Sequence, residues 1–227
     1  MGASSPLLLL WLAADPASAG LNKARDAQDR TALQLFAASL SAEAVKQPSN
    51  AAAHYQAAFA QSTLAEVAQE LRDKNQARAA SEAGIQAAER ALALSADKAE
   101  YHRIHGTLCG QAAAAVGGLG ALKFGKCALD EVEKALKLDP KSSINYVSRG
   151  VGNYYLPAAL GGGVELAIQD FEKATQIDPK SADAYLWLGV ALRKANRNGE
   201  ARKAFEKSVA LNPARIWAKQ QLNKTGP

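Results

Sequence analysis

The sequence predicts an all-α protein built as an α-solenoid, in which antiparallel helix hairpins stack in a row with a capping helix at each end. Composition is the first indication: aromatic residues make up only 6%, and no long segment alternates apolar and polar residues as a strand does. The second is a set of similar segments that recur along the chain, each with apolar residues at helical spacing. The third is a small residue that follows each of these segments at a fixed offset.

The first nineteen residues differ from the rest of the chain. Residues 7–14 form an apolar run of eight, which is shorter than the roughly 20 residues that a membrane-spanning helix needs. Ala17-Ser18-Ala19 then has the small-x-small pattern that signal peptidase cleaves. We therefore expect residues 1–19 to be a signal peptide, the mature chain to be periplasmic or extracellular, and no stable membrane span. A disordered or partly buried N-terminus is the alternative.

Residues 20–48 are expected to cap the N-terminal end of the stack. Leu21 to Lys46 has the pattern of one long amphipathic helix, whose apolar side holds four larger residues. These are Leu33, Phe36, Leu40 and Val45.

Four repeats follow, at residues 49–96, 97–140, 141–179 and 180–213. The last three end in an Asp-Pro or Asn-Pro pair, and the first ends in a degenerate copy without the proline. Proline stops a helix because it lacks an N–H group and disfavours helical geometry in the residue before it. The units measure 48, 44, 39 and 34 residues, so we expect the hairpins to shorten along the chain. Residues 214–227, with Ile216 and Trp217, predict a C-terminal capping helix.

A glycine recurs inside the first helix of the last three units. Glycine costs about 1 kcal/mol relative to alanine in a helix, so its repetition needs a packing reason. We expect each glycine to let the next, antiparallel helix approach closely at an alanine. The expected pairs are Gly106 with Ala128, Gly150 with Ala167 and Gly189 with Ala201.

The last two units resemble a known family. In the 34-residue unit the matching residues are Tyr185, Leu188, Gly189, Ala201, Phe205 and Pro213. In the unit before, they are Tyr146, Gly150, Ala167, Phe171, Ala174 and Pro179. Their spacing resembles the signature of the tetratricopeptide repeat (TPR) family, and the resemblance extends more weakly over residues 49–213. With the signal peptide, it implies an exported bacterial TPR protein whose superhelix binds a protein or peptide partner on its concave face, without catalysis.

The resemblance also implies which residues line that concave face, because the first helix of each TPR unit lies along it. At the matching positions stand Tyr55, Phe59, Arg103, Thr107, Val147, Val151, Leu186 and Val190. One turn further along the same helices stand Tyr154, Tyr155, Arg193 and Lys194. Such an apolar, tyrosine-lined groove with a basic end suits an extended hydrophobic segment or an apolar ligand. The alternative is that a neighbouring helix fills this row.

The distribution of charged residues indicates which classes of partner the chain would bind. The chain has 27 Lys and Arg against 22 Asp and Glu, and ten of the bases lie from Lys180 onward. An acidic partner could therefore be favoured near the C-terminal repeat. The bases form no dense stripe interleaved with aromatic residues, so nucleic-acid binding is not expected.

No sequence signature of an enzyme, a cofactor site or a nucleotide site is present. The prediction is a non-catalytic scaffold or adaptor without a cofactor. The alternative is a periplasmic carrier or transport-accessory protein for an apolar small molecule, motivated by the long hairpins and by the Gly-rich loop at residues 156–163.

Gly118 lies in a Gly-rich segment that predicts a turn, and Cys109 and Cys127 stand nine residues before and nine residues after it. They would be level across an antiparallel hairpin and could form a disulfide in an oxidising compartment, or remain two buried thiols. His102 and His105 are expected to pack between helices rather than to hold a metal, because a metal site needs at least three convergent ligands.

Overall fold

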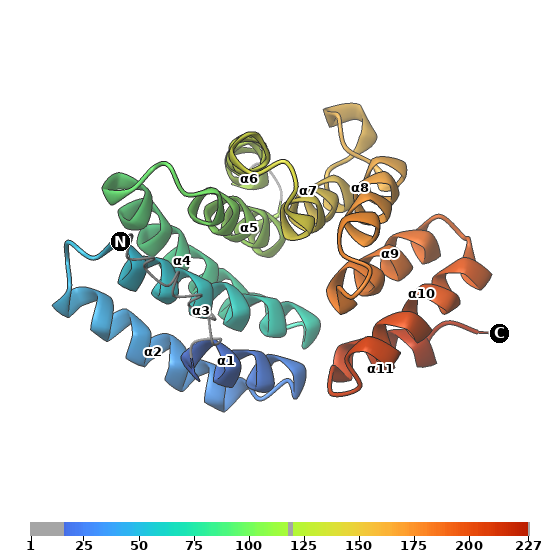
Figure 1. The fold of residues 1–227 in the computed structure, drawn as a ribbon, viewed down its shortest axis with the longest axis horizontal. Helices are drawn as coiled ribbons and strands as arrows, with labels where there is room; N and C mark the ends of the chain where they lie inside the picture. The colour runs from blue at the N-terminus through green and yellow to red at the C-terminus, as the bar shows by residue number, and fades with distance from the viewer. Residues whose placement is uncertain (1–15, 118–119, 227) are drawn as a thin grey trace, which may run out of the picture.

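The computed structural model describes residues 16–117 and 120–226, and within them it contains eleven α-helices, one short 3-10 helix and no strand. Successive helices pack as antiparallel pairs, which confirms the predicted all-α solenoid (Figure 1). The apolar run at residues 7–14 lies outside the described part. None of the helices described there is both long and apolar enough to cross a membrane.

The N-terminal cap is two helices rather than the single long helix that the sequence predicts. Helix α1 (Pro16–Asp26) and helix α2 (Arg30–Lys46) are separated by a tight turn, in which Gln28 has a left-handed φ of 52°. Asp29 caps α2 by accepting a hydrogen bond from the Ala32 N–H at 3.0 Å. Val45 does not join the apolar side of α2 and is 78% exposed, because Ala44 occupies the buried position at that turn of the helix. The expected cleavage site after Ala19 lies within α1.

Each expected repeat holds one helix pair. The pairs are α3 (Ala51–Glu70) with α4 (Lys74–Leu94), α5 (Ala99–Val116) with α6 (Gly120–Leu138), α7 (Ser143–Tyr155) with α8 (Val164–Ile177), and α9 (Ala182–Lys194) with α10 (Asn198–Leu211). The C-terminal cap is α11 (Ile216–Asn223). Helices α3 to α6 have 18 to 21 residues and α7 to α10 have 13 or 14, so the hairpins shorten along the chain. The Gly-rich segment makes a non-helical loop around the 3-10 helix η1 (Ala158–Leu160).

The helix glycines accommodate aromatic rings more than they accommodate alanines. A Cβ added at Gly150 would lie 2.6 Å from Phe171 Cε1, and one added at Gly189 would lie 2.6 Å from Phe205 Cε1. The expected neighbours Ala167 and Ala201 are therefore not the closest atoms, because the ring four residues further along fills the notch.

At Gly106 the backbones do approach as predicted. An added Cβ would lie 3.0 Å from the Ala128 carbonyl oxygen and 2.7 Å from Val132 Cγ2. A glycine here allows helices α5 and α6 to come into close contact.

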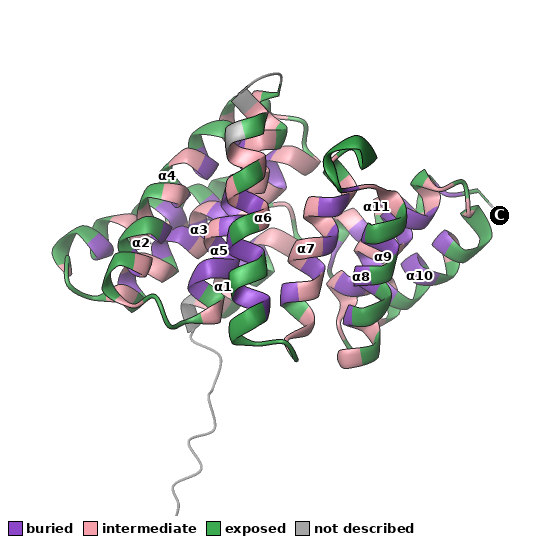
Figure 2. Ribbon diagram, turned by 90° about the horizontal axis from the view of Figure 1, so that it is seen from above, coloured by how far each residue is buried: buried purple, intermediate pink, exposed green. Residues whose placement is uncertain are grey.

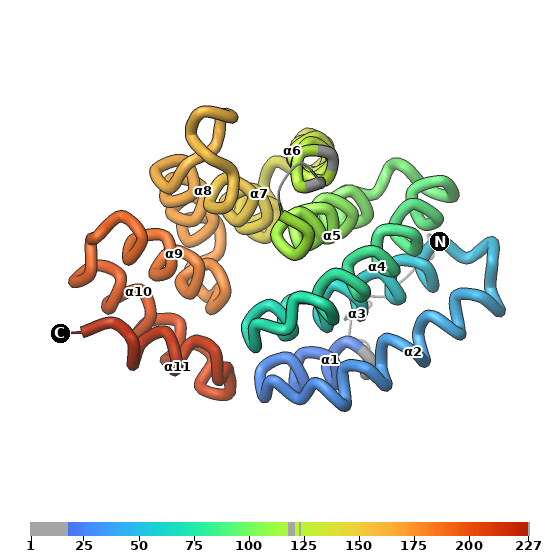
Figure 3. Tube along the Cα trace, turned by 180° about the vertical axis from the view of Figure 1, so that it is seen from behind, coloured from blue at the N-terminus to red at the C-terminus, as the bar shows by residue number. Residues whose placement is uncertain are grey.

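The array bends into an arch whose two ends come together. Helices α5, α7 and α9 lie on its inner side, with α6, α8 and α10 outside, and α11 comes back beside α1 (Figures 1 and 3). Buried residues follow the helix sides that face neighbours in the row (Figure 2). One core cluster surrounds Phe171 and Phe205 in the C-terminal half, and another surrounds Leu33 and Leu64 in the N-terminal half.

Candidate partner-binding surface

Four of the expected groove residues are buried inside the row. Arg103, Val147, Leu186 and Val190 all have less than a tenth of their surface exposed. Val147, Leu186 and Val190 belong to the C-terminal core cluster. A partner could not reach them without opening the row, so at these positions the packing of neighbouring helices fills the predicted groove.

Tyr55 and Phe59, near the N-terminal end, are half-buried and border an apolar pocket. Tyr55 stacks on Tyr101 with ring centroids 5.0 Å apart. Leu21 of α1 and Leu40 of α2 line the same pocket, which has a volume of about 260 Å³. Its size suits one apolar side chain or a small apolar group.

An aromatic cluster, defined here as Tyr154, Tyr155, Trp187 and Trp217, joins α7, α9 and α11. The ring centroids are 5.0 Å apart for Tyr154 and Tyr155, 6.4 Å for Tyr155 and Trp187, and 5.3 Å for Trp187 and Trp217. The sequence predicts the two tyrosines as groove residues but not the two tryptophans. Trp187 falls between the family's groove positions, and the sequence pattern around Trp217 indicates only a capping helix.

Tyr155 is the most accessible ring of the cluster, with 54% of its surface exposed. The pKa of its phenol is nevertheless raised to about 12, because surrounding protein atoms, the Tyr154 phenol and the Glu70 carboxylate disfavour the phenolate. The Tyr155 side chain is therefore accessible to solvent while its hydroxyl group lies close to other protein atoms. Both are expected of a side chain on the inner side of the arch.

The two cations expected at the basic end have different roles. Arg193 donates hydrogen bonds to Gln221 and Thr225, so it anchors the C-terminal helix and is not available as a groove cation. Lys194 is exposed, donates to the Tyr154 carbonyl at 2.7 Å, and lies 4.1 Å from the centroid of the Tyr154 ring. It therefore places a positive charge at the edge of the aromatic cluster.

The remaining expected groove residues contact other parts of the chain. Thr107 is half-buried and donates to the Ser148 hydroxyl at 3.3 Å. Val151 is half-buried against the C-terminal core.

A buried arginine ties the two ends of the arch together beside the aromatic cluster. Arg215 is only 1% exposed; its guanidinium lies 2.8 Å from Glu66 and hydrogen-bonds Glu70, both on α3. We call these three residues the Arg215 clasp. Burial and the neighbouring Glu66 raise the pKa of Glu70 even though Arg215 opposes the rise. Burial alone would lower the pKa of Arg215, but the two carboxylates more than offset it.

Further polar contacts reinforce the closure. Arg25 lies 2.9 Å from Asp183, and Asn212 donates to Asp26 at 2.8 Å. These pairs are 158 and 186 residues apart in sequence, and the partners of Arg215 are about as far, so no local pattern could have indicated them. The clasp fixes the distance between the arms of the arch and so shapes the inner face on which Tyr155 lies.

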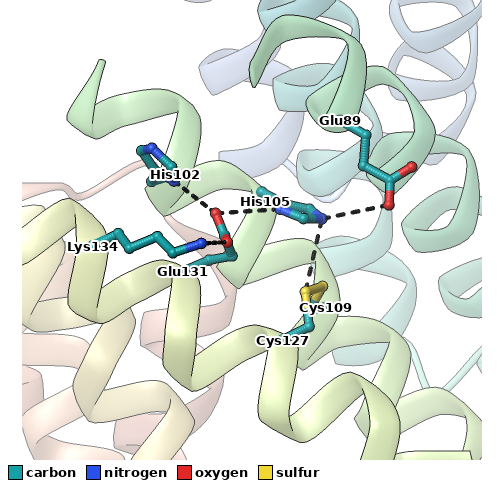
Figure 4. The surroundings of a disulfide bond; sticks show 7 residues. All are labelled: Glu89, His102, His105, Cys109, Cys127, Glu131 and Lys134. Carbon is teal, nitrogen blue, oxygen red and sulfur yellow. Dashed lines mark hydrogen bonds and ion pairs between the residues drawn. A yellow bond between two sulfur atoms is a disulfide. The ribbon is translucent and has the colours of Figure 1, made fainter. Parts of the chain in front are cut away.

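Cys109 and Cys127 form a disulfide between α5 and α6, with their Cα atoms 5.9 Å apart (Figure 4). His105 Nε2 lies 3.7 Å from Cys127 Sγ. On the other side of this ring, Glu131 accepts hydrogen bonds from His102 Nδ1 at 2.7 Å and from Lys134 at 2.6 Å. Burial alone would raise the pKa of Glu131, but these two donors together with the nearby His105 more than offset that rise, and the pKa is lowered.

Comparison with solved structures supports the fold. The thermophilic TPR protein TTC0263 of Thermus thermophilus is 12% identical and superposes with a TM-score of 0.65 over 92% of this chain and 98% of its own. Two other TPR proteins superpose less closely. YrrB, described as having an unusual peptide-binding site, is 19% identical with a TM-score of 0.45 over 92% of this chain and 98% of its own. The Arabidopsis OM64 TPR domain is 24% identical with a TM-score of 0.42 over 55% and 96%.

Family models match both halves of the chain, whereas no curated protein matches it. Residues 160–196 match a TPR repeat model, and residues 182–215 match a tetratricopeptide repeat model that coincides with the last predicted unit. Residues 17–156, more than half of the sequence, match the model of a single family. The chain belongs to the family described as Regulator of microtubule dynamics protein 1-3, and its C-terminal part consists of TPR repeats.

Proposed function

We propose that the chain is a non-catalytic scaffold that binds an extended segment of a partner protein on the inner face of the arch, at the aromatic cluster. The TPR fold is generally a protein-interaction scaffold. The observation that carries the proposal is the exposed Tyr155 ring, held between Trp187 and Tyr154 with Lys194 at the edge.

The chemistry of this surface favours a protein segment. Tyr and Trp offer large, rigid contact area with a polar end, and they are enriched among the residues that dominate interface energy. An apolar side chain of the partner would lie on the Tyr155 ring. An acidic residue of the partner would pair with Lys194, in line with the basic C-terminal region.

The family name makes microtubules the first partner to test. In a co-sedimentation experiment with purified microtubules, Tyr155→Glu is expected to weaken binding by roughly thirtyfold, since losing an interface hot spot costs about 2 kcal/mol or more. Leu122→Glu is the matched control, because Leu122 is 55% exposed on the outer helix α6. Failure of the unaltered chain to sediment would exclude microtubules as partner, and equal loss in both variants would contradict the inner-face site.

Export is a separate part of the proposal. It is supported by the apolar run, by Ala17-Ser18-Ala19, and by the disulfide, a bond that persists in oxidising compartments. Microtubules lie in the cytoplasm, so an exported chain would use the same surface for a different protein. N-terminal sequencing of the protein from its own cells tests export: a chain that begins at Gly20 supports it, and an uncleaved cytoplasmic chain contradicts it.

A carrier of an apolar small molecule is the second candidate, and the apolar pocket at Tyr55 and Phe59 favours it. Phe59→Glu would then abolish the binding of an apolar fluorescent probe while Tyr155→Glu leaves it unchanged. Probe binding that neither variant alters would exclude this pocket as the carrier site.

A further inference from the structure

The disulfide lies beside a histidine that points at it. His105 and Cys109 are four residues apart on α5, so both side chains lie on one face of that helix. Cys127 comes from the facing helix α6. His105 Nε2 and the two sulfur atoms all lie within 4.8 Å of one another (Figure 4).

These three atoms are close to the spacing of a tetrahedral zinc site. Zn–S distances of about 2.3 Å and Zn–N distances of about 2.0–2.1 Å place a thiolate sulfur about 3.6 Å from an imidazole nitrogen, and two sulfurs about 3.8 Å apart. Cys127 Sγ is already 3.7 Å from His105 Nε2. Once the disulfide bond between Cys109 and Cys127 is reduced, the two sulfur atoms need only move apart to about 3.8 Å to reach the spacing of a zinc site.

The far side of the His105 ring has the arrangement that supports a metal-bound histidine. Glu131 Oε2 lies 3.4 Å from His105 Nδ1, within ion-pair distance although no hydrogen bond joins the two atoms, so this carboxylate is placed to orient the ring when Nε2 binds a metal. His102 and Lys134 hold Glu131 in place by their hydrogen bonds. Metal-binding histidines commonly donate a hydrogen bond from their second nitrogen to a carboxylate, which fixes the tautomer and the orientation of the ring, and Glu131 is the carboxylate within reach of that role.

We propose that the reduced protein binds one thiophilic divalent cation of the Zn²⁺ class through Cys109, Cys127 and His105. Two thiolates and an imidazole select such an ion over Mg²⁺ or Ca²⁺, which prefer oxygen ligands. Glu89 Oε1 lies 4.0 Å from His105 Nε2, and the Glu89 side chain is 61% exposed. The fourth position would therefore be taken by this carboxylate or by water.

The disulfide and the metal site are two alternative states of the same atoms. A dithiol reductant attacks the Cys127 sulfur, which is the more accessible one, and releases the Cys109 thiolate. The second thiol of the reductant then displaces Cys127 and leaves as its own disulfide, so two electrons and two protons pass to the cysteines. Binding of the metal ion releases those two protons to solvent. The fold therefore carries a redox-controlled metal site, and this inference does not depend on the proposed function.

Cobalt(II) is the probe that tests the site, because thiolate ligands give it a charge-transfer absorption in the near ultraviolet. The full chain, reduced with a phosphine and freed of it under anaerobic conditions, is expected to bind one Co²⁺ that Zn²⁺ displaces. The oxidised chain is expected to give no such absorption. Zn²⁺ should also raise the melting temperature of the reduced chain and leave that of the oxidised chain unchanged.

Variants identify the ligands. Cys127→Ser should abolish the thiolate absorption, and His105→Ala should weaken Co²⁺ binding by at least about tenfold. Glu131→Gln, which alters a residue that positions His105, should weaken binding by about 10- to 100-fold while the absorption spectrum keeps its shape. His54→Ala is the matched control and should bind as the unaltered chain does, because His54 lies outside the site and contacts the Pro48 carbonyl.

Equal Co²⁺ binding by the oxidised and reduced chains, or by Cys127→Ser, would overturn the proposal. A reduced chain that loses its helical circular dichroism and does not recover it with Zn²⁺ would overturn it as well.

Discussion

The Arg215 clasp gives the most direct test of the closed arch. Arg215→Ala removes the cation that contacts both Glu66 and Glu70. Breaking a buried ion pair from one side costs about 3–5 kcal/mol, because it leaves a buried charge without compensation. Glu70 is almost fully buried, while Glu66 has 28% of its side chain exposed and stays partly hydrated. We therefore expect a loss near the lower limit, about 3 kcal/mol in the free energy of unfolding.

Urea denaturation at pH 8 measures this loss, and small-angle X-ray scattering measures whether the arms of the arch separate. Arg78→Ala is the control, because Arg78 and Glu82 form an exposed ion pair on α4 that should contribute only about 0.3–0.5 kcal/mol. A loss for Arg215→Ala no larger than for Arg78→Ala, with an unchanged radius of gyration, would refute the idea that the clasp holds the ends together.

Three other predictions concern the packing at Gly150, the titration of Glu70 and the disulfide. Gly150→Ala should destabilise the chain by about 1–3 kcal/mol, because its Cβ would meet the Phe171 ring; Gly152→Ala on the same helix has open space and should be neutral or slightly stabilising, as thermal unfolding would show. The pKa of Glu70 is raised from 4.5 to about 7 on folding, so the folded state keeps this proton longer, and the unaltered chain should lose stability relative to Glu70→Gln as pH rises from 4.5 to 7. A relative gain over that range would contradict the sign of the shift. Replacing both cysteines by serine should lower the stability of the oxidised chain by about 3 kcal/mol, given the loop of 18 residues; unchanged urea midpoints would count against a formed disulfide.

Helix-level features of this chain are readable from the sequence because they depend on local patterns. The Asp/Asn-Pro pairs mark where α6, α8 and α10 end, at Leu138, Ile177 and Leu211. The unit lengths predict that the hairpins shorten. These signals act over a few residues, where backbone sterics and side-chain periodicity decide the outcome.

Other features could not be predicted because they depend on distant or subtle geometry. The turn between α1 and α2 requires a left-handed φ at Gln28. Glycine is the residue that usually indicates such a turn in a sequence, and this position has none. Phe171 and Phe205, rather than alanines, fill the notches at Gly150 and Gly189, since a ring can reach one turn along the neighbouring helix. The Arg215 clasp joins segments that only the curvature of the whole array brings together.

The inner-face binding surface is the central claim, and site-specific photo-crosslinking tests it without knowledge of the partner. The chain is produced in its own cells with benzoylphenylalanine in place of Tyr155 or, in a parallel sample, in place of Leu122 on the outer helix. We expect irradiation to attach the same partner segment at position 155 and nothing reproducible at position 122. Crosslinks at both positions alike, or at position 122 alone, would contradict the account.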